Sequence, residues 1–360
     1  MSITSFFQQS FGVLPDIAVR NPGRVNLIGE HLDYNGGAVL PFALNKGIDL
    51  ALRRIDAEKV RIRSDRFETP AVFGHGERPE GGWARYAYFS AELARELGWW
   101  EGGLEIAIMS DLDHGSGLSS SAALCVATLR ALRDQAGRSE SDVDIARLAR
   151  RVENELIGMP CGIMDQMAVA VPRPGQALFL DTRSLEFETI PLPKSHRFIT
   201  IHTGVYRELA DGRYKERKEE CDVAKAFFGT DDLCHLELEK VKAAEGLSDA
   251  VRRRTVHCIT EHKRVVDAAA AMSSADMTTF GTLMNESHAS MRDDFEMSVP
   301  GVDAVVETCW KAGALGARLT GGGFGGCVVA LVEPDKAEAL VAEVLSQQSA
   351  AFVVDGGVSA

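Results

Sequence analysis

Three features that are common in other protein classes are missing from this 360-residue sequence. The seven cysteines form no Cys-x-x-Cys pair and are odd in number, which excludes a zinc ribbon and a disulfide framework. The N-terminus lacks the basic and apolar regions of a signal peptide. No apolar run approaches the roughly 18 residues that span a bilayer. We therefore expect a cytoplasmic protein with reduced, packed thiols and no membrane partner.

Basic residues are also scarce. The formal net charge is −13, from 39 Lys and Arg against 52 Asp and Glu. Nucleic-acid-binding faces normally show as a basic excess, so we expect no nucleic-acid partner. Anionic small molecules are still allowed, because a local dipolar pocket can overcome a distant field.

The order of the predicted elements indicates an α+β protein with two domains. At about 150 residues per domain, the length fits two domains. Short strands dominate the first third, helices cover about 206–292, and a mixed segment follows, which is not a regular βαβ alternation. We place the boundary near 190, which gives domains 1–190 and 191–360. Charge runs within 206–292 are interpreted as solvated helix faces.

The predicted elements follow from hydrophobic periodicity and turn residues. The predicted strands are 16–19, 38–44, 47–55, 59–64, 103–110, 175–181, 197–203, 316–320, 327–332 and 350–355. Outside the helical region, the predicted helices are 83–99, 120–135, 143–158, 301–313 and 334–348.

Residues 23–37, "GRVNLIGEHLDYNGG", mix many polar groups with Val, Leu and Ile. A solvent loop does not need the apolar residues. An unpaired polar group in a buried strand costs roughly 1–3 kcal/mol. The polar side chains of this stretch must therefore have partners.

Residues 114–124, "HGSGLSSSAAL", join a predicted strand to a predicted helix. Glycines permit tight curvature, and a helix N-terminus offers unpaired N–H groups and a partial positive charge. Such a loop can hold phosphate, and a first-turn hydroxyl can ligate Mg²⁺. It is not a Walker loop, because Gly-Lys-Ser/Thr occurs nowhere in the chain. A helix that is simply capped by serine is the alternative.

Residues 318–331, "RLTGGGFGGCVVAL", formally contain G-x-G-x-x-G. A dinucleotide site needs a helix after that pattern, and here a strand follows at once. The oxidoreductase interpretation is therefore rejected. Five glycines in six residues favour a functional loop over a tight hairpin, which would need fewer.

Residues 159–167, "MPCGIMDQM", place Asp165 among apolar neighbours. By itself this aspartate is either a helix cap or a functional carboxylate. Glu153, twelve residues upstream, would by itself be read as a surface acid.

Taken together, these stretches resemble the galactokinase family of the GHMP small-molecule kinases. "GRVNLIGEHLDYNGG" is similar to the family's sugar signature, "GSGLSSSAAL" to its phosphate motif, and "ENELIGMPCGIMDQ" and "RLTGGGFGGC" to its catalytic-Asp segment and third motif. "ADGRYKERKEEC" and "SHASMRDDFEMSVPGVD" resemble two further blocks. The resemblance keeps one order from about residue 5 to 332. It implies a two-domain fold of mixed sheets with helices and an active site in the interdomain cleft.

The resemblance also implies an activity, the phosphorylation of galactose at its anomeric hydroxyl by ATP with Mg²⁺. Arg24 and Asp165 match the catalytic pair. The residues that match sugar ligands are Arg24, Glu30, His31, Asp33, Gly162, Asp165 and Tyr214. Those that match the nucleotide site are Trp83, Gly115, Ser116, Gly117, Leu118, Ser119, Ser120 and Ser121. The third motif contributes Gly321, Gly322, Gly323 and Gly325, and Ser121 and Glu153 match the Mg²⁺ site.

The resemblance gives the polar residues of 23–37 their partners. Carboxylates such as Glu30 and Asp33 accept paired hydrogen bonds from adjacent sugar hydroxyls. We expect the Val, Leu and Ile between them to form the other face of a strand that anchors this polar edge.

Two alternatives remain open at this stage. One is a related kinase that acts on N-acetylgalactosamine, arabinose or another sugar, and the other is a non-catalytic galactose and ATP sensor. The chain also departs from the family pattern at Leu32, where many members have Thr, and at Asp113 and His114 before the phosphate motif. We expect a monomer or a weak dimer.

Overall fold

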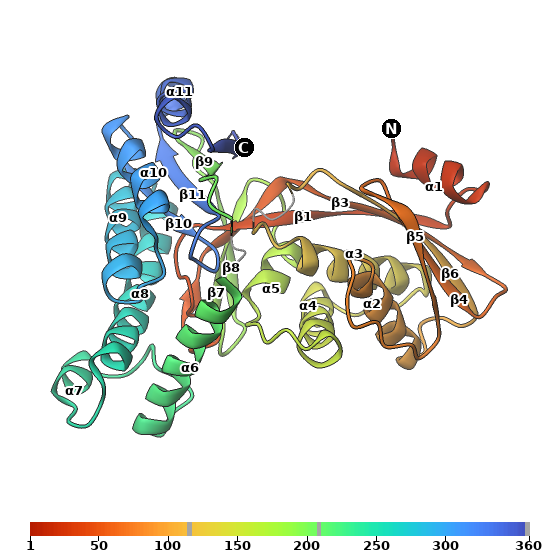
Figure 1. Cartoon of the computed structure of the whole chain (residues 1–360), viewed down its shortest axis with the longest axis horizontal. Coiled ribbons are helices and arrows are strands. Elements are labelled where there is room, and N and C mark those ends of the chain that lie inside the picture. Colours follow the sequence, from red (N-terminus) through yellow and green to blue (C-terminus); the bar gives the residue numbers. More distant parts are fainter. Residues whose placement is uncertain (114–116, 207–209, 357–360) are drawn as a thin grey trace. The chain divides into compact units, whose positions relative to one another are not determined.

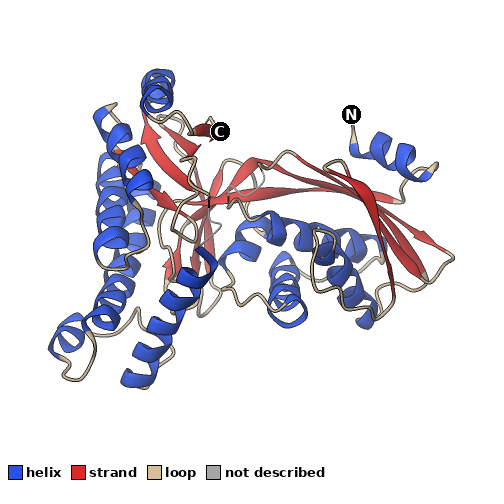
Figure 2. Cartoon of the chain, viewed as in Figure 1, coloured by secondary structure: helices blue, strands red, loops and turns tan. Residues whose placement is uncertain are grey.

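A computed structural model describes residues 1–113, 117–206 and 210–356. Its elements are labelled in Figure 1 and coloured by type in Figure 2. The chain forms two compact units. Unit 1 contains Met1–Arg24, Asn45–Leu112 and Ser119–Val171, and unit 2 contains Val25–Leu44, Asp113–Leu118 and Pro172–Ala360. Residue 190 falls inside the last segment of unit 2, so the division into 1–190 and 191–360 stays a prediction about sequence domains.

The sheet of unit 1 is mixed. β3 (Pro41–Ile55) pairs antiparallel with β6 (Gly103–Ser110), and Ala51 lies opposite Ala107. β6 runs parallel to β4 (Lys59–Ser64), which pairs antiparallel with β5 (Phe67–Gly74). β1 (Ile17–Asn26) pairs with β3. The small Ala51 and Ala107 leave room on one face for Phe7 of α1 (Ile3–Phe11), which is fully buried.

The helices of unit 1 pack on the opposite face of the sheet from α1, as Figure 1 shows. They are α2 (Arg85–Glu96), α3 (Ser120–Gln135), α4 (Asp142–Arg151) and α5 (Met164–Ala170). α4 begins at a capping box of Ser141 and Asp144. It continues directly into a π-helix, Val152–Ile157, which ends at Gly158 with φ +78°. The predicted helix 143–158 is therefore helical throughout, but its last turn is wider than an α-helix.

Unit 2 contains two antiparallel groups of strands. β7 (Gln176–Asp181) pairs with β2 (Ala38–Val39) and β8 (Phe187–Pro191). The second group has the order β10 (Gly316–Thr320), β11 (Cys327–Val332), β9 (Arg197–His202), β12 (Phe352–Asp355).

Helices supply the rest of unit 2. They are α6 (Ala210–Phe228), α7 (Leu238–Ala243), α8 (Asp249–Ser273), α9 (Met277–Asp293), α10 (Pro300–Lys311) and α11 (Ala337–Gln347), with a short 3-10 turn at Pro334–Lys336. In Figure 1, α8, α9 and α10 lie beside the β9–β11 strands. α9 comes close to β10 through Gly281, because a Cβ at that position would lie 2.6 Å from the carbonyl carbon of Leu315.

Most predicted elements are confirmed, and the α+β class with mixed sheets holds. Two predictions are wrong. Residues 38–44 and 47–55 are not two strands of similar length, because β3 runs unbroken from Pro41 to Ile55. The strand predicted to continue through the sugar signature ends at Asn26, and residues 27–37 form turns. α1, β5 and β8 were not predicted at all.

The cysteines and the helices can be described directly. All seven cysteines lie in the described residues as thiols outside any disulfide, and all except Cys161 are buried. Among the helices of the described residues, none combines the length and apolarity that a membrane crossing needs.

Candidate active site

Arg24 and Asp165 meet in unit 1 as a two-pronged ion pair. The Nε of Arg24 donates to Oδ1 of Asp165 at 2.8 Å, and its Nη2 donates to Oδ2 at 2.7 Å. Arg24 stands near the end of β1 and is 6% exposed, whereas the Asp165 side chain is 32% exposed. Asp165 lies in the first turn of α5, whose N-cap is Ile163. The cap interpretation of Asp165 is therefore wrong, and its carboxylate pairs with Arg24 instead.

The serine cluster supplies a second partner for Asp165. Ser119 precedes α3 with φ +58°, and its side chain makes no capping hydrogen bond. Instead its hydroxyl donates to Oδ2 of Asp165 at 2.5 Å. The alternative of a plain serine cap is therefore excluded at this position. The left-handed backbone at Ser119 turns its hydroxyl away from the helix and toward the carboxylate.

The rest of the predicted phosphate loop is described in part. Gly115 and Ser116, together with His114, lie outside the described residues. Gly117 has φ +72°, and Leu118 is buried. Ser120 is exposed at the first turn of α3, where helix N–H groups have no partner within the helix.

The predicted Mg²⁺ ligands Ser121 and Glu153 lie together. Ser121 and Gln166 both hydrogen-bond the Glu153 carboxylate. Burial raises the pKa of Glu153, although these two hydrogen bonds oppose the rise. Glu153 stands on the π-helix and is 5% exposed, so the surface-acid interpretation is wrong. π turns occur often at functional sites.

A carboxylate and a hydroxyl are ligands of the kind that Mg²⁺ takes, so these residues fit the ion. No group of three or more His, Cys, Asp or Glu that could hold a metal occurs in 1–113, 117–206 and 210–356. Mg²⁺ does not need such a group, because it commonly binds through one or two protein ligands, waters and substrate phosphates.

The predicted sugar ligands Glu30, His31 and Asp33 lie in unit 2, on the turns that follow β1. Glu30 is 2% exposed, His31 is 5% exposed, and Asp33 is partly buried. His31 adopts φ +61°, a backbone conformation that a strand does not provide. The apolar residues between them still serve as anchors, because Leu27, Ile28 and Leu32 are fully buried.

The aromatic side chains of unit 2 hold the His31 ring in place. Its Nδ1 lies 2.5 Å from the hydroxyl of Tyr34. The ring centroids of Tyr214 and Phe295 lie 5.0 and 4.6 Å from that of His31. The structure therefore brings Tyr214 next to His31 from α6, although nearly 200 residues separate them in sequence. Tyr34 is a site residue that the sequence analysis did not select.

The glycine-rich third motif connects β10 to β11, as its position before a strand predicted. Thr320 pairs with Cys327 at the loop end of this hairpin. Its glycines approach the chain's own backbone: a Cβ at Gly323 would lie 2.8 Å from the Met297 carbonyl oxygen, and one at Gly325 would lie 2.7 Å from that of Val205. A simple hairpin does not make such contacts. They therefore explain why this loop contains more glycines than a simple hairpin needs.

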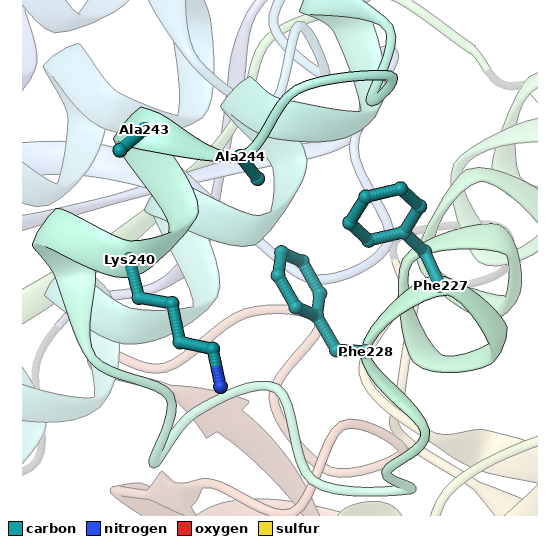
Figure 3. Close-up of a pocket in the computed structure, with 5 residues that line it drawn as sticks. All are labelled: Phe227, Phe228, Lys240, Ala243 and Ala244. Carbon is teal, nitrogen blue, oxygen red and sulfur yellow. The ribbon is translucent and has the colours of Figure 1, made fainter.

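Two further features are the surroundings of Trp83, a predicted nucleotide residue, and a pocket in unit 2. Trp83 stacks on Phe67 with a centroid distance of 4.9 Å and an interplanar angle of 1°. A separate pocket lies between the end of α6 and α7, lined by Phe227, Phe228, Lys240, Ala243 and Ala244 (Figure 3). None of the predicted site residues lines that pocket.

Comparison with known proteins decides the family. Residues 5–54 match the galactokinase galactose-binding signature, residues 85–172 the GHMP kinases N terminal domain, and residues 268–350 the GHMP kinases C terminal family. The galactokinase of Roseiflexus sp. (strain RS-1) is 38% identical over 341 residues, which cover 92% of this chain and 87% of that protein. The chain belongs to the galactokinase family.

Solved structures agree with membership of the galactokinase family. The crystal structure of Lactococcus lactis galactokinase complexed with galactose matches with a TM-score of 0.90 and 31% identity, covering 98% of this chain and 96% of that one. The Methanococcus jannaschii mevalonate kinase shares the fold, with a TM-score of 0.70 at 20% identity over 94% of this chain and 97% of that one.

In this galactokinase-family chain, Arg318 and Glu261 are two buried charged residues that the sequence analysis missed. Arg318 is fully buried and pairs with Glu30, and Glu261 is fully buried on α8. The prediction of solvated helix faces is wrong for Glu261 and for Arg254, which is 1% exposed. A signal for Arg318 was available, because it is the first residue of the glycine-rich stretch 318–331. No signal in the charge pattern distinguishes Glu261 from its exposed neighbours.

Proposed function

We propose that this chain transfers the γ-phosphoryl group of ATP to the anomeric C1 hydroxyl of galactose, giving galactose 1-phosphate. The observation that supports the reaction site most directly is the Arg24–Asp165 pair with Ser119 on the same carboxylate. A carboxylate held by an arginine and a serine is oriented to receive a hydroxyl group at one defined place. The match to a galactose-binding signature supports galactose as the substrate.

Asp165 orients the attacking hydroxyl and accepts its proton, and Arg24 stabilises charge on the transferring group. Phosphoryl transfer needs little covalent help from a protein, so positioning and charge neutralisation supply most of the rate. Arg24 suits the second role because its guanidinium is planar, always charged and already fixed in direction. The amides and hydroxyls of residues 117–121 serve the triphosphate.

Ser121 and Glu153 would hold the Mg²⁺ that accompanies ATP. The chemistry that the ion would supply there is neutralisation of the negative charge of the phosphates. The hydrogen bond between Ser121 and Glu153 keeps the two oxygen atoms that would ligate the ion close together before the ion binds. Trp83 offers an aromatic face to the adenine ring.

Glu30, His31, Asp33, Gly162 and Tyr214 select the sugar. Carboxylates accept from adjacent hydroxyls, and the His31 ring is held by its hydrogen bond with Tyr34. A site built this way rejects epimers, because a misplaced hydroxyl leaves a buried group unpaired. We further propose that the enzyme works in the cytoplasm, as its free cysteines favour, and that it is a monomer or a weak dimer.

A coupled ADP-release assay with a panel of sugars tests the proposal. We expect galactose to give the highest kcat/KM, above N-acetylgalactosamine and arabinose, and Asp165→Ala to abolish turnover while the chain stays folded. A better rate with another sugar would replace galactose as the substrate. Binding of galactose and ATP without turnover would identify a sensor instead.

A further inference from the structure

Arg318 is an arginine with no exposed surface that sits between two buried carboxylates. Its Nη2 pairs with Oε2 of Glu30, and the same nitrogen lies 3.8 Å from Oε1 of Glu261. Both carboxylate side chains are at most 2% exposed. Arg318 comes from β10, Glu30 from the turn after β1, and Glu261 from α8, so three separate segments of unit 2 meet here.

Glu261 holds the backbone directly before Glu30. Its Oε1 accepts from the backbone N–H of Gly29 at 3.0 Å and from the Ser287 hydroxyl at 2.5 Å. Its Oε2 accepts from Nε of Arg264 at 2.7 Å. Gly29 has φ +106°, and a Cβ at that position would lie 2.9 Å from Val265 and 3.0 Å from the Ala38 carbonyl oxygen. The turn is thus fixed against α8 at the residue that precedes Glu30.

Glu30 itself is held from two directions. Besides Arg318, the backbone N–H of Gly321 donates to its Oε1 at 3.0 Å. Each carboxylate oxygen can accept two hydrogen bonds, so one acceptor position per oxygen stays open after these contacts. The glycine-rich motif and the sugar signature therefore meet at this one carboxylate.

The charge of Arg318 opposes protonation of Glu30. Burial has the larger effect and raises the pKa of Glu30, and the charge and hydrogen bond of Arg318 offset part of that rise. Without the arginine, the carboxyl group would favour its neutral form, which loses acceptor capacity and gains a donor.

We propose that Arg318 and Glu261 are positioning residues for sugar recognition, which hold the Glu30 carboxylate in the single orientation that accepts hydroxyls of galactose. This inference rests on the proposed function, because it requires Glu30 to be a sugar ligand. A purely stabilising role explains the arrangement poorly, since buried ion pairs often add little stability compared with well-packed apolar residues.

Unit 2 contains a matched comparison. Arg254 is also an almost fully buried arginine with two carboxylate partners, Glu220 and Glu296. No predicted ligand is among its ion-pair partners. Arg254→Lys therefore measures how far the replacement of a buried arginine by lysine in unit 2 changes the galactose KM when no predicted ligand is its partner.

Steady-state kinetics of the full chain test the inference, with galactose and ATP varied separately. Losing a hydrogen bond to a charged group corresponds to about a tenfold change or more, so we expect Arg318→Lys to raise the galactose KM by about that factor. The KM for ATP should stay within about twofold, because the arginine acts only through Glu30. Glu261→Gln keeps the side chain's size and should raise the galactose KM less, whereas Arg254→Lys should leave it unchanged.

The kinetic results decide whether Arg318 and Glu261 are positioning residues. If Arg318→Lys and Arg254→Lys change the galactose KM equally, or if neither Arg318→Lys nor Glu261→Gln changes it, the positioning role is overturned. If Arg318→Lys does not fold, Glu261→Gln alone decides by the same criterion. Glu30→Gln separates this inference from the proposed function: an unchanged galactose KM there removes Glu30 from the sugar ligands, whereas a raised one keeps it and leaves only Arg318 and Glu261 in question.

Discussion

At the scale of single residues, the Asp165 carboxylate is already engaged on both oxygens. Arg24 occupies one position on each oxygen, and Ser119 occupies a second on Oδ2. A carboxylate held in this way has a fixed direction, and its three hydrogen-bond donors make it a weak base for the proton that it accepts. Its main contribution is therefore to aim a hydroxyl group, while the adjacent guanidinium stabilises the charge that develops during transfer.

Arg24→Ala should lower kcat far more than it weakens galactose binding, because the positive charge matters most in the transition state. By analogy with the loss of one charge-stabilising donor, kcat should fall about 100-fold to 1,000-fold. Steady-state kinetics and calorimetric galactose titration measure the two effects. Arg20→Ala is the matched control, since Arg20 stands on the same strand but pairs at the surface with Asp49 and Asp111. Equal losses in kcat and in galactose affinity would contradict the role of Arg24.

Glu153→Gln should raise the Mg²⁺ concentration that activity requires without lowering the stability of the fold. The Mg²⁺ concentration for half-maximal activity should rise about tenfold, because the ion loses its charged protein ligand. The melting temperature should not fall, because burial already disfavours the ionised form of Glu153. Glu155→Gln, an exposed position on the same π-helix, is the control. An unchanged Mg²⁺ requirement would remove Glu153 from the metal site.

At the scale of elements, periodicity predicted those whose pattern is regular, and it failed where backbone conformation is special. α3 begins and ends where its periodicity predicts. The turns at Gly29 and His31 were read as a strand, because their positive φ angles leave no mark in the alternation of polar and apolar residues. The π turn at Glu153 is hidden for the same reason, since a π-helix and an α-helix bury similar residue types.

Contacts between residues that lie far apart in the sequence were the second feature that periodicity could not predict. The resemblance placed Glu30 in the sugar site, but its partner Arg318 lies more than 200 residues away in the chain, and so does Glu261, which holds the backbone of Gly29. A single sequence gives no physical signal for which buried charges meet. Tyr34 was missed differently, because a tyrosine beside His31 looks like any turn residue until the ring geometry is seen.

The packing of α1 on the unit 1 sheet gives an element-scale prediction. Phe7 is fully buried against Ala51 and Ala107, whose small side chains cannot fill the space that its ring would leave. Phe7→Ala should therefore lower the free energy of unfolding by about 3–5 kcal/mol. Urea denaturation measures the change, and Gln9→Ala on the exposed face of α1 should have almost no effect. A loss below about 1 kcal/mol would mean that α1 is not part of the cooperative core.

At the scale of the whole molecule, several buried ionisable groups make folding stability depend on pH in opposite directions. Burial lowers the pKa of His257 to about 4. For Glu261, burial favours the neutral form, but the charges of Arg264, His257 and Arg318 outweigh it and lower the pKa to about 2. Burial raises the pKa of Glu30 and Glu153. Only a comparison between variants can therefore isolate one group.

His257 gives the clearest prediction of the direction in which folding stability changes with pH. An unfolded histidine binds a proton below about pH 6.5, whereas the folded one stays neutral down to about pH 4. Between these values the unfolded state holds more protons, so acidification favours unfolding, and the full loss is about 3 kcal/mol. The buried ring hydrogen-bonds the Ser290 hydroxyl and lies against the ring of Phe295. His257→Gln removes the titration but keeps a hydrogen-bonding side chain. Urea unfolding from about pH 7 to about pH 5 should therefore show a steeper decline for the natural chain than for the variant, because only the natural chain carries this proton linkage. Parallel declines would show that His257 is protonated in the folded protein.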